Sequence, residues 1–385
     1  MVKTGLDVLL SSQAELKKLH RVGLVSHPPA VLPDFTHILD ALLEAGVSLT
    51  ALFGPEHGFD ASAADGASVD NSIDRRTGLP VFSLYGPNKE PGFSMLENVD
   101  TLLFDMQDVG VRFYTFISTL YYVLRGAAAA NKTVIVLDRP NPINGCVVSG
   151  PSIKPGYESF VGIVPLPIRH GLTIGELAQY FNAEYGFRAE LTVIQMEGWR
   201  RSMWFDDTGL PWTPLSPGMP HLSTAVVYPG MCFLEGTNLS EGRGTALPFE
   251  VAGAPWLDGS SLAQALNALA LPGVRFRPVS FVPSSSKHKD ETCQGIQVHV
   301  TDRSSFEPLT TGLHLIAECQ AQAPQKFAFL DSSWEGGKPH FDLLAGSDDI
   351  RLGLEAGKPV EDIVQEWTAF VESFNMVRQK YLLYS

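Results

Sequence analysis

One glutamate, Glu56, has the local setting that acid–base chemistry requires. It lies in the string Gly54-Pro55-Glu56-His57-Gly58, where the glycines allow close backbone approach and the proline stiffens the turn. A glutamate held rigidly in this way can give or take a proton during a reaction. His57 can orient the carboxyl group or bind a substrate. A glutamate that only caps a helix or forms a salt bridge is the alternative.

Two aspartates, Asp105 and Asp108, form a second acidic group with Gln107 between them. In an extended chain Asp105 and Gln107 share one face, and Asp108 turns to the other. Paired carboxylates suit acid/base work, a metal ion or a simple turn cap. Arg112 follows closely enough in the chain to neutralise one of the two carboxylates. A purely structural ion pair of this kind is the alternative to a chemical role.

Cations and further polar groups follow later in the chain. Arg139 lies in Asp138-Arg139-Pro140-Asn141-Pro142, where two prolines fix the turn. Its guanidinium can bind a substrate carboxylate through two hydrogen bonds, or form a network with Asp138. Arg169-His170-Gly171 places a cation and an imidazole before a helix, and the glycine-rich segment 235–245 either clamps a ligand or connects elements.

These residues follow apolar runs that alternate with helical patterns. The runs have no polar face, which indicates parallel strands buried on both sides; they are Val22–Ser26, Leu49–Phe53, Val81–Tyr85, Thr101–Asp105 and Thr133–Asp138. Ligands of open parallel sheets bind beyond the carboxyl ends of the strands. We therefore expect Glu56, Asp105 and Arg139 at one edge of a single sheet.

The chain as a whole predicts an α/β protein with two domains. A Rossmann-like, mostly parallel sheet domain is expected over residues 1–222, and a smaller α+β domain over 223–385. Further predicted elements are helices at 34–44, 113–130, 173–185, 311–320 and 360–381, strands at 190–195 and 295–300, and a loop at 200–222.

Composition and missing motifs exclude several functions. The net charge of −14 argues against nucleic acid or an anionic membrane surface as partner. No glycine-rich phosphate loop occurs, so no nucleotide cofactor is expected. No metal-ligand spacing occurs, and no metal is predicted. Four widely spaced cysteines favour free thiols. With no apolar run of membrane-spanning length, the chain is expected to be cytoplasmic as given, or secreted or periplasmic if a signal peptide was removed. The oligomeric state stays open.

Several long motifs, in this order, resemble those of the exo-β-N-acetylmuramidases of bacterial cell-wall recycling. The motifs are Gly54–Gly58, Phe104–Gly110, Arg112–Tyr114, Leu137–Pro142, Arg169–Gly171, Glu235–Ser240 and Gly242–Thr245. The resemblance covers nearly the whole chain. Departures are small: Glu241 stands where a small or apolar residue is usual, and Met106 replaces a β-branched residue.

The resemblance implies a Rossmann-like domain without nucleotide, a smaller domain that closes a cleft, and exo-hydrolysis of N-acetylmuramic acid from peptidoglycan fragments without a metal. It places the catalytic glutamate on Glu56. Asp105, Asp108 or the acetamido group of the substrate would support the oxocarbenium-like state. The implied substrate-binding residues are His27, His57, Gln107, Arg112, Tyr114, Arg139, Asn141, Arg169, His170, Glu235, Asn238 and Arg243.

The lactyl carboxylate of muramic acid requires a cation, and four of those arginines are suited to it: Arg112, Arg139, Arg169 and Arg243. Two alternatives to a glycosidase remain, a metal-dependent hydrolase and a non-catalytic amino-sugar-binding protein.

Overall fold

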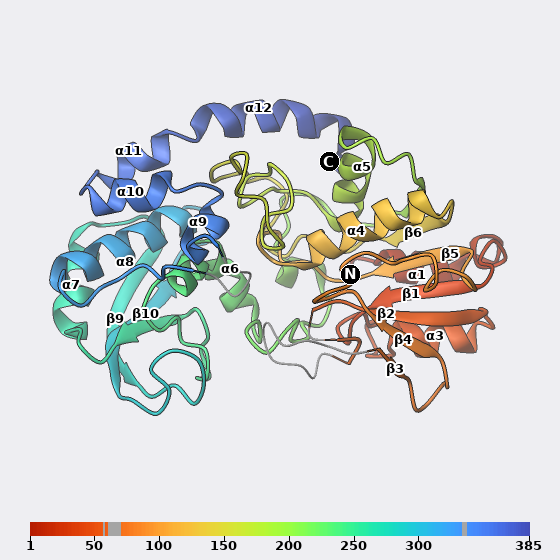
Figure 1. The fold of residues 1–385 in the computed structure, drawn as a ribbon, viewed down its shortest axis with the longest axis horizontal. Helices are drawn as coiled ribbons and strands as arrows, with labels where there is room; N and C mark the ends of the chain where they lie inside the picture. Colours follow the sequence, from red (N-terminus) through yellow and green to blue (C-terminus); the bar gives the residue numbers. More distant parts are fainter. Residues whose placement is uncertain (57, 61–70, 333–336) are drawn as a thin grey trace. The chain divides into compact units, whose positions relative to one another are not determined.

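The computed structural model describes residues 1–56, 58–60, 71–332 and 337–385. The chain forms two compact units, each drawn in Figure 1. Unit 1 comprises Met1–Val147, His170–Pro217 and Asn375–Ser385, and unit 2 comprises Val148–Arg169 and Gly218–Phe374. A domain boundary at residue 222 stays a prediction. No helix among the described residues is long and apolar enough to cross a membrane.

Unit 1 is built on a mostly parallel sheet, as predicted. Within the described residues its strands run in the order β3-β4-β2-β1-β5-β6-β7, and β3 alone is antiparallel to its neighbour. The strands are β1 (Val22–Ser26), β2 (Leu49–Gly54), β3 (Ser72–Ile73), β4 (Pro80–Ser83), β5 (Thr101–Asp105), β6 (Thr133–Leu137) and β7 (Glu190–Ile194). Each of the five predicted runs overlaps one of these parallel strands.

Helices pack on the sheet of unit 1 and bury its apolar side chains. They are α1 (Gly5–Ser11), α2 (Gln13–Leu16), α3 (Ile38–Glu44), α4 (Phe116–Ala129) and α5 (Ile174–Glu184). Leu9 of α1 and Leu42 of α3 share one core cluster with alternate strand residues such as Leu24. Side chains of a strand alternate between faces, so the remaining strand residues face away from this cluster. Helices α4 and α5 pack on each other and on β6 (Figure 1).

The register of the strands brings their carboxyl ends to one edge. Ser26 of β1 pairs with Asp105 of β5, and Gly54 of β2 pairs with Ser83 of β4. Phe104 pairs with Val136, so β6 ends beside β5. The loops that carry Glu56, Asp105 and Arg139 therefore leave the sheet at the same edge, as the sequence predicted.

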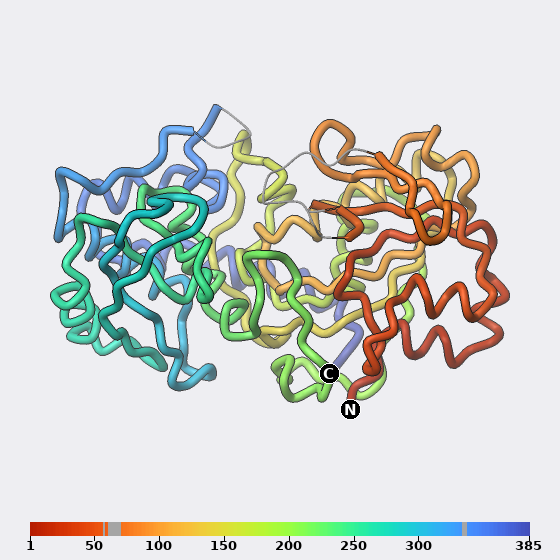
Figure 2. The backbone as a smooth tube through the Cα atoms, turned by 90° about the horizontal axis from the view of Figure 1, so that it is seen from below, coloured from red at the N-terminus to blue at the C-terminus, as the bar shows by residue number. Residues whose placement is uncertain are grey.

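Both chain termini belong to unit 1 and contact the same segment of it. Lys3 forms an antiparallel bridge with Glu197, and the backbone N–H of Arg201 donates to the carbonyl of Ser385. Figure 2 shows the two ends beside each other. The last residues of the chain are thus part of the packing of unit 1.

Unit 2 contains a three-stranded antiparallel sheet in the order β8-β10-β9 among its described residues. Its elements are α6 (Leu222–Met231), β8 (Val251–Ala254), α7 (Gly259–Ala268), β9 (Val274–Phe281), β10 (Cys293–Val300), α8 (Pro308–Gln322), α9 (His340–Ala345), α10 (Asp349–Glu355) and α11 (Val360–Gln365). The smaller α+β unit is confirmed. The helical stretch predicted over 360–381 is interrupted by a turn at Glu366 and Trp367, after which the chain continues as α12 (Thr368–Arg378) and a 3-10 turn, Gln379–Tyr381.

Candidate active site

The loop after β2 holds Glu56 in a tight turn. A side chain on Gly54 would collide with the backbone nitrogen of Phe59, so only glycine fits there. Gly58 has a φ of 84°, and its N–H donates to the carbonyl of Pro55 over 2.9 Å. Glu56 itself is half-buried, and its Oε2 accepts a 2.7 Å hydrogen bond from the hydroxyl of Thr115. The carboxyl group is therefore fixed by a partner 59 residues away.

Asp105, at the end of β5, is bound by Arg139 from the exit of β6. Nε of Arg139 donates to Oδ1 of Asp105, and Nη2 donates to Oδ2 over 2.9 Å. The Asp105 side chain is fully buried and that of Arg139 is 5% exposed. Nη1 of Arg139 donates to the carbonyl of Val31 over 3.5 Å, so both carboxylate oxygens of Asp105 and all three guanidinium nitrogens of Arg139 are used within the protein. This geometry favours a positioning role for the pair over direct contact with substrate.

Asp108 and His170 meet at the same edge with hydrogen-bonding capacity left over. Oδ2 of Asp108 accepts from the N–H of Gly110 over 2.6 Å and lies 3.6 Å from Nε2 of His170. Nδ1 of His170 accepts from the N–H of Leu172, so in the neutral ring the proton is on Nε2. Among the described residues, Oδ1 of Asp108 and Nε2 of His170 are buried without a hydrogen-bond partner. Such atoms are uncommon in a folded core, and a bound water, ion or ligand would satisfy them.

His27, Gln107 and Asn141 connect the strand exits to one another. Nε2 of His27 accepts from the backbone N–H of Gln107 over 2.9 Å. The Gln107 amide donates to the carbonyls of Asp108 and Pro140 over 2.8 and 2.7 Å. The Asn141 amide donates to the carbonyl of Leu172 over 2.9 Å. These hydrogen bonds of the three predicted binding residues join their side chains to the protein backbone.

Arg112 and Tyr114 precede α4 and are buried. The Arg112 side chain is fully inaccessible, and burial lowers its pKa to about 9. Tyr114 is 8% exposed, and its ring lies edge-on to Phe116 at a centroid distance of 4.7 Å. Phe116 in turn contacts the His27 ring at 4.9 Å. The start of α4 is therefore anchored to the loop that follows β1.

Asp138, at the exit of β6, was predicted only as a partner of Arg139. Its oxygens accept from the Arg139 and Gly175 backbone N–H groups and from the hydroxyls of Thr173 and Tyr384. Burial raises the pKa of Asp138 to about 7, against the lowering effect of these donors. The Tyr384 contact spans 246 residues, so no local pattern in the sequence indicates it.

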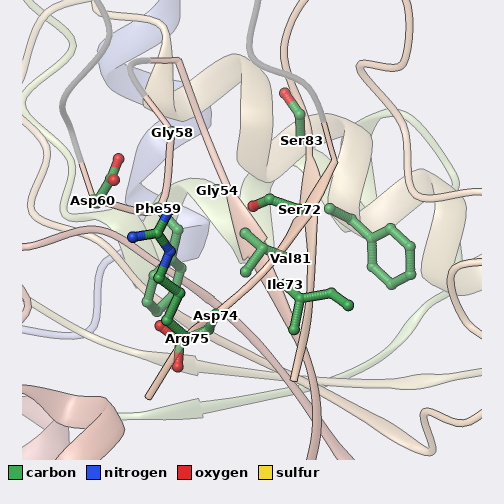
Figure 3. Close-up of a pocket in the computed structure, with 11 residues that line it drawn as sticks. Gly54, Gly58, Phe59, Asp60, Ser72, Ile73, Asp74, Arg75, Val81 and Ser83 are labelled. Atoms are coloured by element: carbon green, nitrogen blue, oxygen red, sulfur yellow. The ribbon is translucent and has the colours of Figure 1, made fainter. Parts of the chain in front are cut away.

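A cavity of about 530 Å³ opens beside the Glu56 turn (Figure 3). Among the described residues it is lined by Gly54, Gly58, Phe59, Asp60, Ser72, Ile73, Asp74, Arg75, Val81, Phe82 and Ser83. These residues come from the ends of β2 and β4 and from the edge strand β3. A volume of this size falls in the range of small-molecule sites. Arg75, Asp60 and Ser72 are lining residues that the sequence did not single out.

A second cavity, of about 20 Å³, lies against Gln107 and Arg139 at the exits of β5 and β6. His57 lies outside the described residues. Within them, no group of three or more His, Cys, Asp or Glu side chains is arranged to hold a metal ion.

The remaining predicted site residues belong to unit 2. Arg243 binds Glu235 through Nε over 2.8 Å, and Glu235 also accepts from the thiol of Cys232. Burial acts to raise the pKa of Glu235, but Arg243 and His340 outweigh it and hold that pKa well below its usual range.

Asn238 in unit 2 uses its amide on the backbone of Lys326 and Ala328. Arg169 is 4% exposed, and its backbone pairs with that of Ser149. The polar side chains Glu235, Asn238 and Arg243 of the segment 235–245 thus form hydrogen bonds with other residues of unit 2.

Comparison with known proteins identifies matches along the whole chain. A family model described as "Exo-beta-N-acetylmuramidase NamZ, N-terminal" matches residues 22–223, and its C-terminal counterpart matches residues 226–384. A curated relative from Bacillus subtilis (strain 168), "Peptidoglycan beta-N-acetylmuramidase NamZ", is 46% identical over 384 residues. The match covers 100% of this chain and 91% of the relative.

Two crystal structures of DUF1343 family proteins from Bacteroides fragilis NCTC 9343 have the same fold. One has a TM-score of 0.91 and 38% identity, and the other has a TM-score of 0.80 and 30% identity. Each match covers 100% of this chain and 99% of the solved chain.

Proposed function

Because the chain belongs to the exo-β-N-acetylmuramidase family, we propose that it releases N-acetylmuramic acid from the non-reducing end of peptidoglycan fragments, with Glu56 as the proton donor and acceptor. The chain is a glycosidase of that family, and its substrate derives from peptidoglycan. The residues that perform the reaction are the new part of this proposal.

The setting of Glu56 is the observation that carries the proposal. Glycoside hydrolysis needs a carboxylic acid held near the glycosidic oxygen. Glu56 stands in a glycine-bounded turn and is bound by Thr115, and the two glycines of that turn, Gly54 and Gly58, line the cavity of about 530 Å³. A carboxyl group held in a turn beside a ligand-sized cavity suits general acid–base catalysis.

Asp108 is the better second carboxylate of the two that the sequence suggested. Asp105 has both oxygens engaged by Arg139, so protonating or displacing it would break a buried ion pair. Asp108 keeps one buried oxygen without a hydrogen-bond partner among the described residues. We assign Asp108, with His170 beside it, to the substrate, and Asp105 with Arg139 to the support of the strand exits.

Recognition of the lactyl carboxylate is assigned to a buried arginine, Arg112. Arg112 belongs to unit 1 together with Glu56 and lies three residues before Thr115, the partner of the Glu56 carboxyl group. A buried guanidinium is weakly screened by water and binds a carboxylate through two hydrogen bonds.

The experiment that tests the function uses a defined glycan. The protein is incubated with N-acetylmuramyl-N-acetylglucosamine and with a longer chain that has N-acetylmuramic acid at its non-reducing end, and products are followed by mass. Free N-acetylmuramic acid should be released from the non-reducing end of both. Internal cleavage of the longer chain, or no turnover with binding retained, would contradict the proposal.

A further inference from the structure

The hydroxyl group of Thr115 is used on Glu56 rather than on its own helix. Thr115 is the N-cap residue of α4, but its side chain makes no capping hydrogen bond. A threonine in this position commonly accepts a hydrogen bond from a backbone N–H of the first turn. Here the hydroxyl donates instead to Oε2 of Glu56 over 2.7 Å. The usual capping contact has been exchanged for a contact with the proposed catalytic group.

The position of Thr115 is fixed by the core of unit 1. Its neighbours Tyr114 and Phe116 are 8% and 2% exposed, and their rings pack against each other and, through Phe116, against His27. The backbone N–H of Thr119 donates to the Thr115 carbonyl over 3.0 Å and continues the helix. Threonine is also stiff at χ1 because it is branched at Cβ. The Glu56 carboxyl group is therefore held by a rigid helix start.

The same contact suits the carboxylate that proton transfer leaves on Glu56. The N-terminus of a helix carries partial positive charge, and a hydroxyl hydrogen bond is stronger to a carboxylate than to a carboxylic acid. When the glycosidic C–O bond breaks, its electron pair goes to the leaving oxygen, which takes the proton from Glu56. The carboxylate left behind then accepts the Thr115 hydrogen bond. Because the contact strengthens as charge develops, it supports the transition state more than the ground state.

We propose that Thr115 is the positioning residue of the Glu56 carboxyl group, orienting it for proton transfer and stabilising the carboxylate that remains. The inference rests on the proposed role of Glu56. It predicts that Thr115 acts only through Glu56 and contributes mainly when the leaving group needs a proton.

The test compares Thr115→Val, which keeps the shape and removes the donor, with Thr115→Ser, which keeps the donor. Thr119→Val is the matched control, since Thr119 lies one turn along α4, is fully buried, and donates its hydroxyl to the Thr115 carbonyl over 3.4 Å. All three variants are made in the full chain, and Thr115→Val is also made in a Glu56→Gln background. Steady-state kinetics are measured with the disaccharide and with 4-nitrophenyl β-N-acetylmuramide, and folding is followed by thermal unfolding.

Thr115→Val should lower kcat on the disaccharide about tenfold or more with little change in KM, as expected for the loss of one charge-assisted hydrogen bond. The loss should be smaller with the nitrophenyl leaving group, restored by serine, and absent in the Glu56→Gln background. Thr119→Val should retain wild-type kinetics. Thr115→Ala replaces the valine variant if that protein does not fold.

The inference would be overturned if Thr115→Val lowered kcat by the same factor in the wild-type and Glu56→Gln backgrounds. A near-normal kcat of Thr115→Val would overturn it as well. Wild-type activity in Glu56→Gln alone would overturn the proposed role of Glu56 instead.

Discussion

Removing the guanidinium of Arg139 should destabilise unit 1 strongly. In Arg139→Met the fully buried Asp105 loses both hydrogen bonds of its ion pair. Breaking a buried pair by deleting one partner costs about 3–5 kcal/mol, because an uncompensated charge stays in the core. For a domain of this size, about 2–4 °C of melting temperature corresponds to each kcal/mol, so we expect a decrease of roughly 6–20 °C.

The decisive comparison is the double variant Asp105→Leu/Arg139→Met. Removing both charges leaves no unpaired ion, and apolar side chains of similar length then occupy the space. In urea unfolding followed by tryptophan fluorescence, the free energy of unfolding of the double variant should lie within about 1.5 kcal/mol of the wild-type value. It should be clearly higher than that of the Arg139→Met variant. If the single variant loses less than about 1 kcal/mol, or if the double variant is the sum of both single losses, the buried-pair reasoning is refuted.

Three further predictions concern Asp138, the lactyl group and metals. The pKa of Asp138 is raised to about 7, whereas an unfolded aspartate titrates near 3.9, so its contribution to stability is present below about pH 4 and is lost as pH rises to 7. Between pH 5 and pH 7.5, the free energy of unfolding from urea titrations should therefore decrease more for the wild type than for Asp138→Asn. Equal decreases for the two proteins would contradict this. Replacing the muramic acid of a nitrophenyl glycoside by N-acetylglucosamine should slow turnover about tenfold or more, through loss of one charge-assisted contact, whereas equal rates would exclude an arginine contact with the lactyl group. Activity should survive dialysis against EDTA, and a loss that an added divalent metal restores would identify a metal-dependent enzyme.

The strands of the N-terminal sheet were predictable because each one is a short apolar run without a polar face. β1 and β5 begin and end where the sequence placed them. α3 begins four residues later than predicted, because His37 acts as its N-cap and accepts the N–H of Leu39 through Nδ1. β9 carries exposed arginines and Pro278, which is tolerated at the edge of its sheet, and no strand was predicted there.

The side-chain contacts within the site could not be predicted from the sequence. Polar residues after each strand indicated that a site lies at this edge, and the register confirms that the loops leave it together. That Asp105 pairs with Arg139, and Glu56 with Thr115, depends on contacts across 34 and 59 residues. Local patterns report which residues are near in the chain, whereas these contacts are set by the sheet register and by the start of α4.

The most direct test of the account is the kcat of Glu56→Gln on N-acetylmuramyl-N-acetylglucosamine. The amide keeps the size of the side chain and can still accept from Thr115, but it cannot exchange a proton. General acid–base catalysis contributes about 10²–10⁴-fold, so kcat should fall within that range while thermal stability and substrate binding stay near those of the wild type. Glu97→Gln, an exposed glutamate of the same unit, is the matched control and should keep full activity. A Glu56→Gln protein with near-normal kcat, or one that loses activity only because it unfolds, would contradict the assignment.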